Sequence, residues 1–326
     1  MHYVVFKWHF LTDVRFGGSK GQLADSGYIM HSDTLFSALC LEAKKQGGDA
    51  ALDKFYQLCH NKQLLLSDTM PYQGETYFLP KPILKTETKQ QESSSVQKKA
   101  YKKLKYISAE QMPSYLRALS GQAAFDAEQA NKQFRECVYD QARVMVSVKG
   151  QANPRPYYVN TWHFADDAGL YFVAGYENEQ DVLWLEQLIT GLGLSGVGGK
   201  KNSGLGKFEV DAMIFLDESS NSVGLSALRS FLLAKGQWYM TISCALPRED
   251  ELDAALEGAA YQVLKRSGFV DSPQYAKEQR KHKNLYVLSA GSCFAVPFDG
   301  DIYDVSNGGT HPVYRYAQPL FLGVDI

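Results

Sequence analysis

The stretch from Gly191 to Lys207, GLGLSGVGGKKNSGLGK, has the residue types of a loop that binds an anion. Glycine adopts positive φ without steric cost, and consecutive glycines allow neighbouring backbone N–H groups to converge on one anion. The second half of the stretch adds lysines, and no acidic residue occurs in it. We therefore predict a phosphate cradle, with a flexible surface turn as the alternative. The residues assigned to the cradle are Gly196, Gly198, Gly199, Lys200, Lys201, Asn202, Ser203, Gly204 and Lys207.

The order of the flanking elements limits the kind of phosphate. Gly191, Gly193 and Gly196 spell G-x-G-x-x-G, but a dinucleotide fingerprint follows a strand and precedes a helix. Here a helix is expected before the glycines, over 178–189, and a strand after them, so the order is reversed. A mononucleotide P-loop requires lysine where Gly199 stands. A nucleic acid, with its repeated phosphates, is therefore the better ligand.

The N-terminal elements supply further candidates for contact with nucleic acid. A strand is expected over 3–11, and the loop after it carries Arg15, Phe16 and Lys20. A helix is expected from Ser32 as its N-cap, with His31, a further candidate for RNA contact, just before it. A helix N-terminus attracts phosphate, so Arg15 and the Ser32 hydroxyl are expected to converge there on one phosphate. A plain helix cap at Ser32 and a surface ion pair at Arg15 are the alternatives. Phe16 is either a platform for base stacking or a core residue.

The order of elements predicts an α+β fold made of two tandem ferredoxin-like (RRM-like) units. The first unit reads strand, helix, strand, strand, helix, strand once an insertion is left out. Gly47 and Gly48 are expected to end its first helix. The remaining elements of the first half are expected as a second helix over 52–66, an insertion outside the main core at about 67–140, and strands over 142–148, 157–164 and 170–176, the last two joined as a hairpin.

A polar break at 217–222 predicts the domain boundary. The expected domains are therefore 1–216, which contains the insertion, and 217–326, a more degenerate unit. In the second domain we expect a strand over 237–246, a helix over 249–260 and strands within 286–296 and 313–324.

The charge of the chain argues against a free-standing nucleic-acid binder, because the net charge is −2 and the pI is about 6.4. The basic residues are nevertheless clustered. Residues 98–105 carry five lysines and no acid, and residues 265–283 carry six basic residues against two acids. The lysine-rich run at 98–105 is either a binding segment or a solvated loop.

The cysteines and the N-terminus indicate a cytoplasmic protein. The five cysteines are widely spaced and show no C-x-x-C, which favours reduced thiols over a zinc set or a disulfide framework. Residues 1–11 lack the features of a signal peptide, and no apolar run reaches the length of a membrane-spanning helix. No cofactor, structural metal or membrane partner is indicated.

Several segments together resemble the RAMP superfamily of CRISPR RNA-guided complexes, and within it the family of the fourth subunit of the type III-A effector, a Cas5-like subunit. The marks are the duplicated ferredoxin-like order and a glycine-rich loop between the last helix and last strand of the first unit. The matching segments are Val14–Gly17, His31–Leu39, Gly196–Gly206, Lys265–Val270 and His311–Tyr316.

The resemblance implies a non-catalytic subunit that caps the 5′ repeat-derived handle of the crRNA. It also implies contacts with the large polymerase-like subunit and with the adjacent backbone RAMP subunit. An inserted hairpin, the thumb, wedges into the guide–target duplex in such proteins. The candidate for the thumb is the segment 81–105, with Lys98, Lys99, Tyr101, Lys102 and Lys103.

Two other functions stay open. Related RAMP proteins are metal-independent endoribonucleases that process precursor RNA with a histidine, and His31 is the candidate base or acid here, with Lys20 or Tyr28 as its partner. A structural role for His31 at a strand-to-helix junction is the simpler interpretation. Asp33 stands in the first helical turn without a second carboxylate, so we interpret it as a helix starter rather than a metal ligand. A protein-only scaffold is the third function, and the low net charge favours it.

Overall fold

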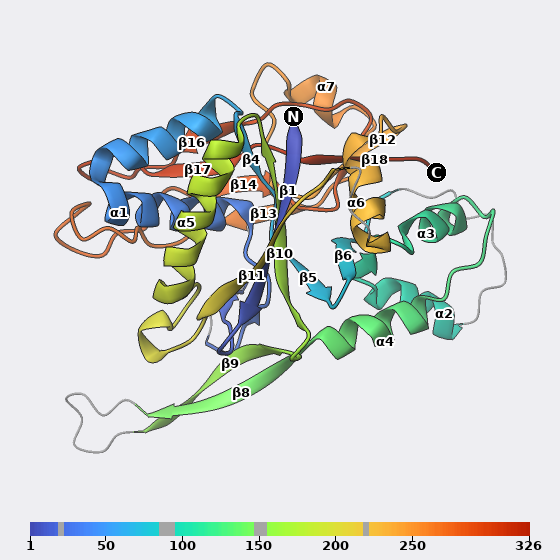
Figure 1. The fold of residues 1–326 in the computed structure, drawn as a ribbon, viewed down its shortest axis with the longest axis horizontal. Coiled ribbons are helices and arrows are strands. Elements are labelled where there is room, and N and C mark those ends of the chain that lie inside the picture. Colours follow the sequence, from blue (N-terminus) through green and yellow to red (C-terminus); the bar gives the residue numbers. More distant parts are fainter. Residues whose placement is uncertain (19–22, 85–94, 147–154, 218–221) are drawn as a thin grey trace.

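A computed structural model describes the chain at residues 1–18, 23–84, 95–146, 155–217 and 222–326 (Figure 1). Lys20 and residues 85–94 of the expected thumb lie outside the described residues.

A seven-stranded antiparallel sheet forms the centre of the molecule, in the order β11-β1-β10-β5-β6-β7, with β4 also paired to β10 (Figure 1). Its middle strands are rich in aromatic and β-branched residues, which suit a sheet covered on both faces. Trp8 stacks on Phe208 with ring centroids 4.2 Å apart, and Phe6 on Phe172 at 5.1 Å. The strands are β1 (His2–Phe10), β4 (Leu64–Leu66), β5 (Met70–Gln73), β6 (Thr76–Pro80), β7 (Tyr106–Ser108), β10 (Ala168–Tyr176) and β11 (Phe208–Phe215).

Helices α1 (Ser32–His60) and α5 (Glu179–Ser195) pack together, and α5 lies against β10 and β11 (Figure 1). Asn178 caps α5 through its side-chain oxygen, which accepts from the Gln180 amide, as expected for an N-cap. Helix α6 (Val223–Leu233) packs against β6 and β18. The end of α5 and the start of β11 therefore lie together at the β11 edge of the sheet.

The expected break at Gly47 and Gly48 is confirmed as a kink, since Gly48 has φ 69° and both residues leave helical geometry. The second helical segment ends at His60 rather than at 66, because residues 64–66 join the sheet as β4. Leucine is compatible with helix and strand, so periodicity alone did not separate the two.

The prediction that residues 67–140 lie outside the main core is wrong for a large part of that segment. Strands β5, β6 and β7 belong to the central sheet, and Tyr77, Phe78 and Ile107 are buried in the core. The prolines at 71 and 80 suggested broken structure, but they lie within β5 and at the end of β6. Helices α2 (Ser95–Lys103), α3 (Met112–Leu119) and α4 (Ala127–Cys137) form a lobe beside these strands (Figure 1).

A long hairpin projects from the body of the molecule (Figure 1). Its strands, β8 (Val138–Val146) and β9 (Pro156–Phe164), pair along their whole length, from Val138 opposite Phe164 to Val146 opposite Pro156. The expected hairpin between 157–164 and 170–176 is therefore wrong, because β9 pairs with β8 while β10 enters the central sheet. The turn residues at 166–169 direct the chain from one sheet into another.

The C-terminal part consists of small antiparallel sheets and two helices. Strand β12 starts one residue later than predicted and is shorter, and α7 covers only part of the helix expected at 249–260. The elements that follow α6 are β12 (Trp238–Thr241), α7 (Leu252–Leu256), β13 (Val263–Arg266), β14 (Leu285–Leu288), β15 (Cys293–Phe294), β16 (Asp301–Asp304), β17 (Tyr314–Ala317) and β18 (Phe321–Val324). They pair as β15-β12-β18, β13-β14 and β16-β17.

The structure confirms a mixed fold of helices and antiparallel sheets. The division into two ferredoxin-like units at residue 216 stays a prediction. In the first half, the elements that make up the pattern strand, helix, strand, strand, helix, strand are β1, α1, β4 with β5, β10, α5 and β11. The strands expected at 142–164 are not part of it. Over the described part of the chain, no helix has the length and apolarity needed to cross a bilayer.

Candidate nucleic-acid interface

The predicted cradle is a loop between α5 and β11, and we call residues 196–207 the glycine loop. Gly196 ends α5 with φ 77°, and Lys200 and Gly204 adopt the left-handed conformation on either side of a single 3-10 turn, η1 (Lys201–Ser203). The side chains from Lys201 to Ser203 are exposed, as is Lys207. The loop therefore presents polar and cationic side chains at its apex, supported by backbone that only glycine accommodates easily.

The glycines also allow the loop to pack tightly on the chain after β1. The Gly199 amide donates to the Arg15 carbonyl at 2.7 Å, and the Gly206 amide donates to the Asp13 carbonyl at 2.8 Å. A Cβ at Gly198 would stand 2.5 Å from the Arg15 carbonyl oxygen. The amides of Gly199 and Gly206 are thus committed to the protein, which corrects the picture of a cradle made of bare glycine amides. The exposed apex, Lys201–Gly204, is the part of the loop open to a ligand.

The lysines of the glycine loop contact two other segments. Lys200 Nζ lies 3.3 Å from the Tyr157 hydroxyl and 5.2 Å from the centroid of its ring, so the loop touches the β8–β9 hairpin. Lys201 pairs with Asp271 at 3.5 Å, and both side chains are exposed. An exposed pair of this kind contributes little to stability and opens readily to an incoming phosphate.

A buried carboxylate, Asp13, joins the glycine loop to the hairpin. Its oxygens accept from His163 Nδ1 at 2.9 Å, from Arg143 Nε at 2.8 Å and from the Thr161 hydroxyl at 2.9 Å. Burial alone would raise the pKa of Asp13, but these hydrogen bonds and the charge of Arg143 outweigh it and lower the pKa. Because the Asp13 carbonyl holds Gly206, one residue fixes the loop and the hairpin relative to each other. Sequence reasoning missed Asp13, and no local motif marks it.

The structure separates the two groups that were expected to share one phosphate. The Arg15 guanidinium lies along the glycine loop, with Nη1 3.0 Å from the place of a Cβ on Gly199, and Nη2 donates to the Asp25 carbonyl. Ser32 is fully buried, and its hydroxyl lies 3.1 Å from Cys244 Sγ. Ser32 is therefore unavailable to RNA, and Phe16, which is 4% exposed, is a core residue rather than a stacking platform.

The N-cap position is also one residue earlier than predicted. His31 precedes α1, and its Nδ1 donates to Asp68 Oδ2 at 2.6 Å. Asp68 accepts in addition from the backbone amides of Ser32 and Cys244. This buried carboxylate replaces a side-chain cap, since it satisfies the first amide of the helix. The remaining exposure of His31, 23%, leaves its other ring edge partly open.

Asp33 is the centre of a buried ionic cluster that sequence reasoning also missed. Arg266 binds both carboxylate oxygens at 2.8 Å, and Arg315 approaches at 3.4 Å while donating to His282 Nε2 at 2.8 Å. Full burial alone would raise the pKa of Asp33, but the two guanidinium groups override it and hold the pKa far below its usual value. The prediction of a helix starter is therefore incomplete: Asp33 ties α1 to β13 and β17.

The same cluster predicts a pH dependence of stability. His282 donates through Nδ1 to the Lys283 carbonyl and accepts from Arg315, and burial together with the Arg315 charge lowers its pKa below the usual 6.5. The unfolded chain therefore binds a proton at a pH where the folded chain does not, so stability is lost as the pH falls below about 6.5. Urea unfolding of the wild type and His282→Gln at pH 7.5 and 5.5 checks this. The wild type should lose more than the variant, and equal losses would exclude His282 as the source.

The lysines proposed for the thumb lie on a helix, not on a hairpin. Helix α2 carries four exposed lysines: Lys98, Lys99, Lys102 and Lys103. Tyr101 is partly buried, with its hydroxyl donating to the Phe125 carbonyl. Helix α2 packs against α4. The projecting hairpin in the described residues is β8–β9, some 40 residues further along the chain.

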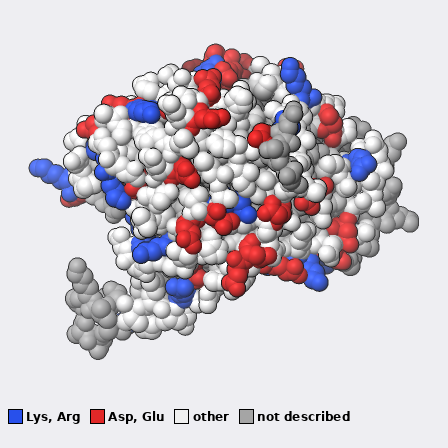
Figure 2. Space-filling view, viewed as in Figure 1, with Lys and Arg blue, Asp and Glu red and all other residues white. Residues whose placement is uncertain are grey.

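Charge is unevenly spread over the surface. Figure 2 shows acidic side chains across the middle of one face, with lysine and arginine side chains at its lower left, beside the base of the β8–β9 hairpin. Within the described residues, no cluster of three or more His, Cys, Asp or Glu is placed to hold a metal ion.

Comparison with known proteins identifies relatives over most of the chain. A family model for the CRISPR Csm4 C-terminal domain matches residues 234–324. The CRISPR system Cms protein Csm4 of Mycobacterium tuberculosis (strain ATCC 25618 / H37Rv) is 38% identical over 294 residues, covering 90% of this chain and 89% of the relative. The Csm4 protein of Streptococcus thermophilus is 31% identical over 330 residues, covering 99% of this chain and all of the relative (100%).

Two solved structures share the fold. A chain of the Csm3–Csm4 subcomplex of the type III-A CRISPR–Cas interference complex matches with a TM-score of 0.65 and 20% identity, covering 99% of both chains. A chain of a Csm1–Csm4 cassette in complex with AMPPNP matches with a TM-score of 0.57 and 17% identity, covering 99% of this chain and 98% of the other. The resemblance noted from the sequence is thereby confirmed, and this chain belongs to the Csm4 family of type III CRISPR complex subunits.

Proposed function

We propose that this chain is the non-catalytic subunit that binds the 5′ repeat-derived handle of the crRNA through its glycine loop. The observation that carries the proposal is the rigid seating of the loop on Asp13 and Arg15, which leaves Lys201, Asn202 and Ser203 exposed at its apex. Single-stranded RNA is bound by fixed positive and polar groups that follow its backbone. A loop that is already ordered loses little conformational entropy when RNA binds.

The β8–β9 hairpin is the better candidate for the thumb that wedges into the guide–target duplex. It projects from the body, and its exposed side chains include four large apolar or aromatic ones besides polar ones: Tyr139, Val144, Val146 and Tyr158 are 51–67% exposed. Apolar side chains of this kind unstack bases when they insert into a duplex. The contact of Lys200 with Tyr157 links the thumb to the handle site. The lysines of α2 stay a prediction as further contacts to the duplex.

The proposed partners are the large polymerase-like subunit and the adjacent backbone RAMP subunit, besides the crRNA and the guide–target duplex. The solved complexes of Csm4 with Csm1 and with Csm3 support both protein contacts. A net charge of −2 is unfavourable for binding RNA alone. In a complex, the partner subunits contribute to the electrostatic field around the RNA, so the low charge of this chain is compatible with RNA binding.

One observation favours the endoribonuclease as a second candidate. The short contact between His31 and Asp68 resembles the arrangement in which a carboxylate orients a catalytic histidine. Asp68 also caps α1 through the Ser32 amide, which accounts for its position without catalysis. We therefore expect no metal-independent cleavage when the purified chain is incubated with labelled repeat RNA. A defined product that disappears in His31→Ala would establish the second candidate instead.

The handle assignment is tested by reversing charge on the glycine loop. Lys200→Glu/Lys201→Glu should weaken binding of a labelled handle RNA at least about tenfold, because two phosphate contacts become repulsive. The salt dependence should become shallower by about 0.7 per lost contact in a log–log plot. Fluorescence anisotropy over a salt series measures both quantities.

The control carries the same charge change elsewhere: Lys44→Glu/Lys235→Glu alters two exposed lysines, on α1 and after α6. Its affinity should stay close to that of the wild type. If both double variants bind alike, the glycine loop is not the handle site.

A further inference from the structure

The strands β13 and β14 continue beyond their regular ends as one long ribbon, and we call residues 263–270 with 280–288 the outer ribbon. Lys265 stands opposite Tyr286 in the regular part. The pairing resumes further along, where Phe269 bridges Lys281 and the Val270 amide donates to the Arg280 carbonyl at 2.9 Å. The two segments of the ribbon are therefore held together by backbone hydrogen bonds at both of its ends.

The two faces of the outer ribbon differ in a regular way. From 263 to 270 the residues alternate between exposed and partly buried, with Val263, Lys265, Ser267 and Phe269 on the exposed side. The inner face holds Arg266 and His282, which belong to the buried cluster around Asp33. Because a strand alternates its side chains, this inner anchoring fixes which residues face outward.

The outer face combines aromatic rings with lysines. Phe269 is 50% exposed and Tyr286 is 56% exposed, although both are large apolar side chains. Lys281 Nζ lies 5.2 Å from the centroid of the Phe269 ring, and Lys265 is the cross-strand neighbour of Tyr286. Each aromatic residue thus has a lysine as its cross-strand neighbour. The four-residue step from Lys265 to Phe269 separates the two ring–lysine pairs by about 13 Å.

This combination fits single-stranded RNA better than a protein partner. Exposed aromatic side chains on a sheet stack successive bases, and neighbouring cations contact the phosphates between them. The buried cores of protein interfaces, in contrast, are depleted in lysine. The surrounding segment is basic as well, with six basic residues against two acids over 265–283.

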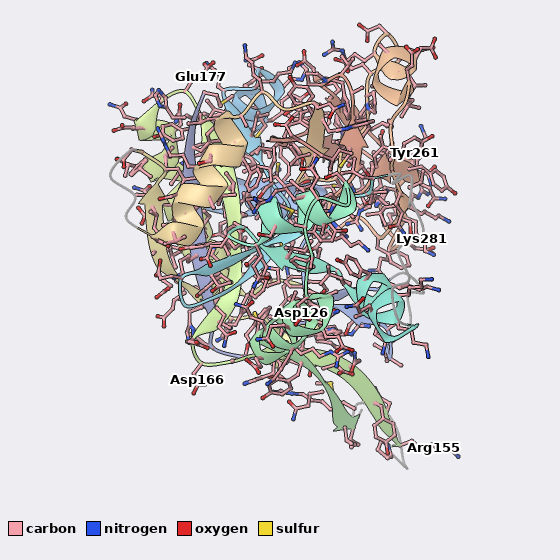
Figure 3. All side chains as sticks on the ribbon, turned by 90° about the vertical axis from the view of Figure 1, so that its right-hand side faces the viewer. Asp126, Arg155, Asp166, Glu177, Tyr261 and Lys281 are labelled. Carbon is pink, nitrogen blue, oxygen red and sulfur yellow. The ribbon has the colours of Figure 1, made fainter. Side chains whose placement is uncertain are left out.

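The outer ribbon also lies next to the proposed handle site. Asp271 directly follows Val270, and it forms the ion pair with Lys201 at the apex of the glycine loop. In Figure 3, Lys281 and the hairpin residue Arg155 lie at the same side of the molecule, while Asp166 and Glu177 lie at the other. One RNA strand can therefore pass from the glycine loop to the ribbon.

We propose that the outer face of the ribbon is a second binding site for the single-stranded crRNA, in which Phe269 and Tyr286 stack bases and Lys265 and Lys281 contact phosphates. This inference rests on the proposed function, because it extends the RNA path that begins at the glycine loop. It assigns RNA binding to the C-terminal part of the chain.

The test measures binding of a labelled handle RNA to the full chain by fluorescence anisotropy. Phe269→Ala/Tyr286→Ala should lower the affinity at least about tenfold, since each ring loses a stacked base. Phe269→Tyr/Tyr286→Phe keeps both rings and should bind like the wild type. Lys265→Ala/Lys281→Ala should flatten the log–log salt dependence by about 1.4. Circular dichroism verifies that each variant is folded.

A second measurement does not depend on variants. Photocrosslinking of the wild type with RNA containing 4-thiouridine should label peptides within 263–270 or 280–288, besides the glycine loop. If neither ribbon variants nor crosslinks show an effect while Lys200→Glu/Lys201→Glu still weakens binding, the ribbon inference is wrong and the handle site stands. If the charge reversal also has no effect, the proposed function itself fails. Loss of a protein partner with unchanged RNA binding would make the ribbon a protein interface.

Discussion

Arg266→Met should destabilise the protein by about 3–5 kcal/mol, the largest effect that we expect from one side chain of the C-terminal part. Arg266 supplies two of the hydrogen bonds to Asp33, a carboxylate with 1% exposure. Without it, the buried negative charge retains the longer contact to Arg315 at 3.4 Å and the neutral Thr34 hydroxyl at 3.2 Å. An uncompensated buried charge is costly because water cannot solvate it. Urea unfolding of both proteins, followed by circular dichroism, gives the difference.

Two further variants make this prediction specific. Arg248→Met removes an arginine whose ion pairs with Asp250 and Glu251 lie near the surface, and its urea midpoint should match that of the wild type. Asp33→Asn added to Arg266→Met should recover part of the lost stability, because the unpaired charge is removed. A midpoint for Arg266→Met that is indistinguishable from that of Arg248→Met would mean that the cluster is not a stabilising element.

Gly206→Ala should destabilise the protein by about 3 kcal/mol or more and should abolish tight binding of the handle RNA. Gly206 has φ 75°, and a Cβ there would stand 1.9 Å from the Val197 carbonyl oxygen. The backbone must shift to accept it, and the shift breaks the hydrogen bond from the Gly206 amide to Asp13. Thermal unfolding and the anisotropy titration report the two effects separately.

Gly204→Ala is the matched control for this change. Gly204 also has positive φ, 85°, but a Cβ there meets no atom within 4 Å. The variant therefore carries only the conformational strain, about 1 kcal/mol. If both alanine variants lose the same stability, the close approach of Gly206 to the Val197 backbone does not explain the glycine at this position.

The glycine loop could be predicted from the sequence because its signal is local. Glycine density and one-sided charge within 17 residues marked both its position and its exposed lysines. The role of individual glycines could not be predicted, since a Cβ at Gly198 would meet the Arg15 carbonyl, more than 180 residues away in the sequence, and a Cβ at Gly206 would meet Val197 across the loop. The amides of Gly199 and Gly206 donate to the Arg15 and Asp13 carbonyls and are therefore not available to a ligand.

The errors in the fold arise where local signals compete with tertiary pairing. Prolines at 71 and 80 suggested an insertion, yet Tyr72, Tyr77 and Phe78 are buried in strands of the central sheet. The residues at 166–169 have turn chemistry, but the strands on either side pair with different partners. In both places the choice of partner strand depends on long-range contacts, to which propensity is insensitive.

The buried cluster shows the same limit in a stronger form. Asp33 was visible as a helix starter, while its partners Arg266 and Arg315 stand 233 and 282 residues further along the chain. Each arginine lies in a segment that carried the family resemblance, Lys265–Val270 and His311–Tyr316. The resemblance thus marked these short segments as characteristic of the family, and the structure explains it, because their arginines come together at Asp33.

The pairing of Asp33 with arginines far along the chain has a consequence for synthesis on the ribosome. The polar start of α1 is made early, but its cationic partners Arg266 and Arg315 follow 233 and 282 residues after Asp33. Tyr316, whose hydroxyl oxygen accepts a hydrogen bond from the Leu66 amide of β4, emerges equally late. The N-terminal half therefore cannot complete its buried ionic cluster or close its core until β13 and β17 have been synthesised.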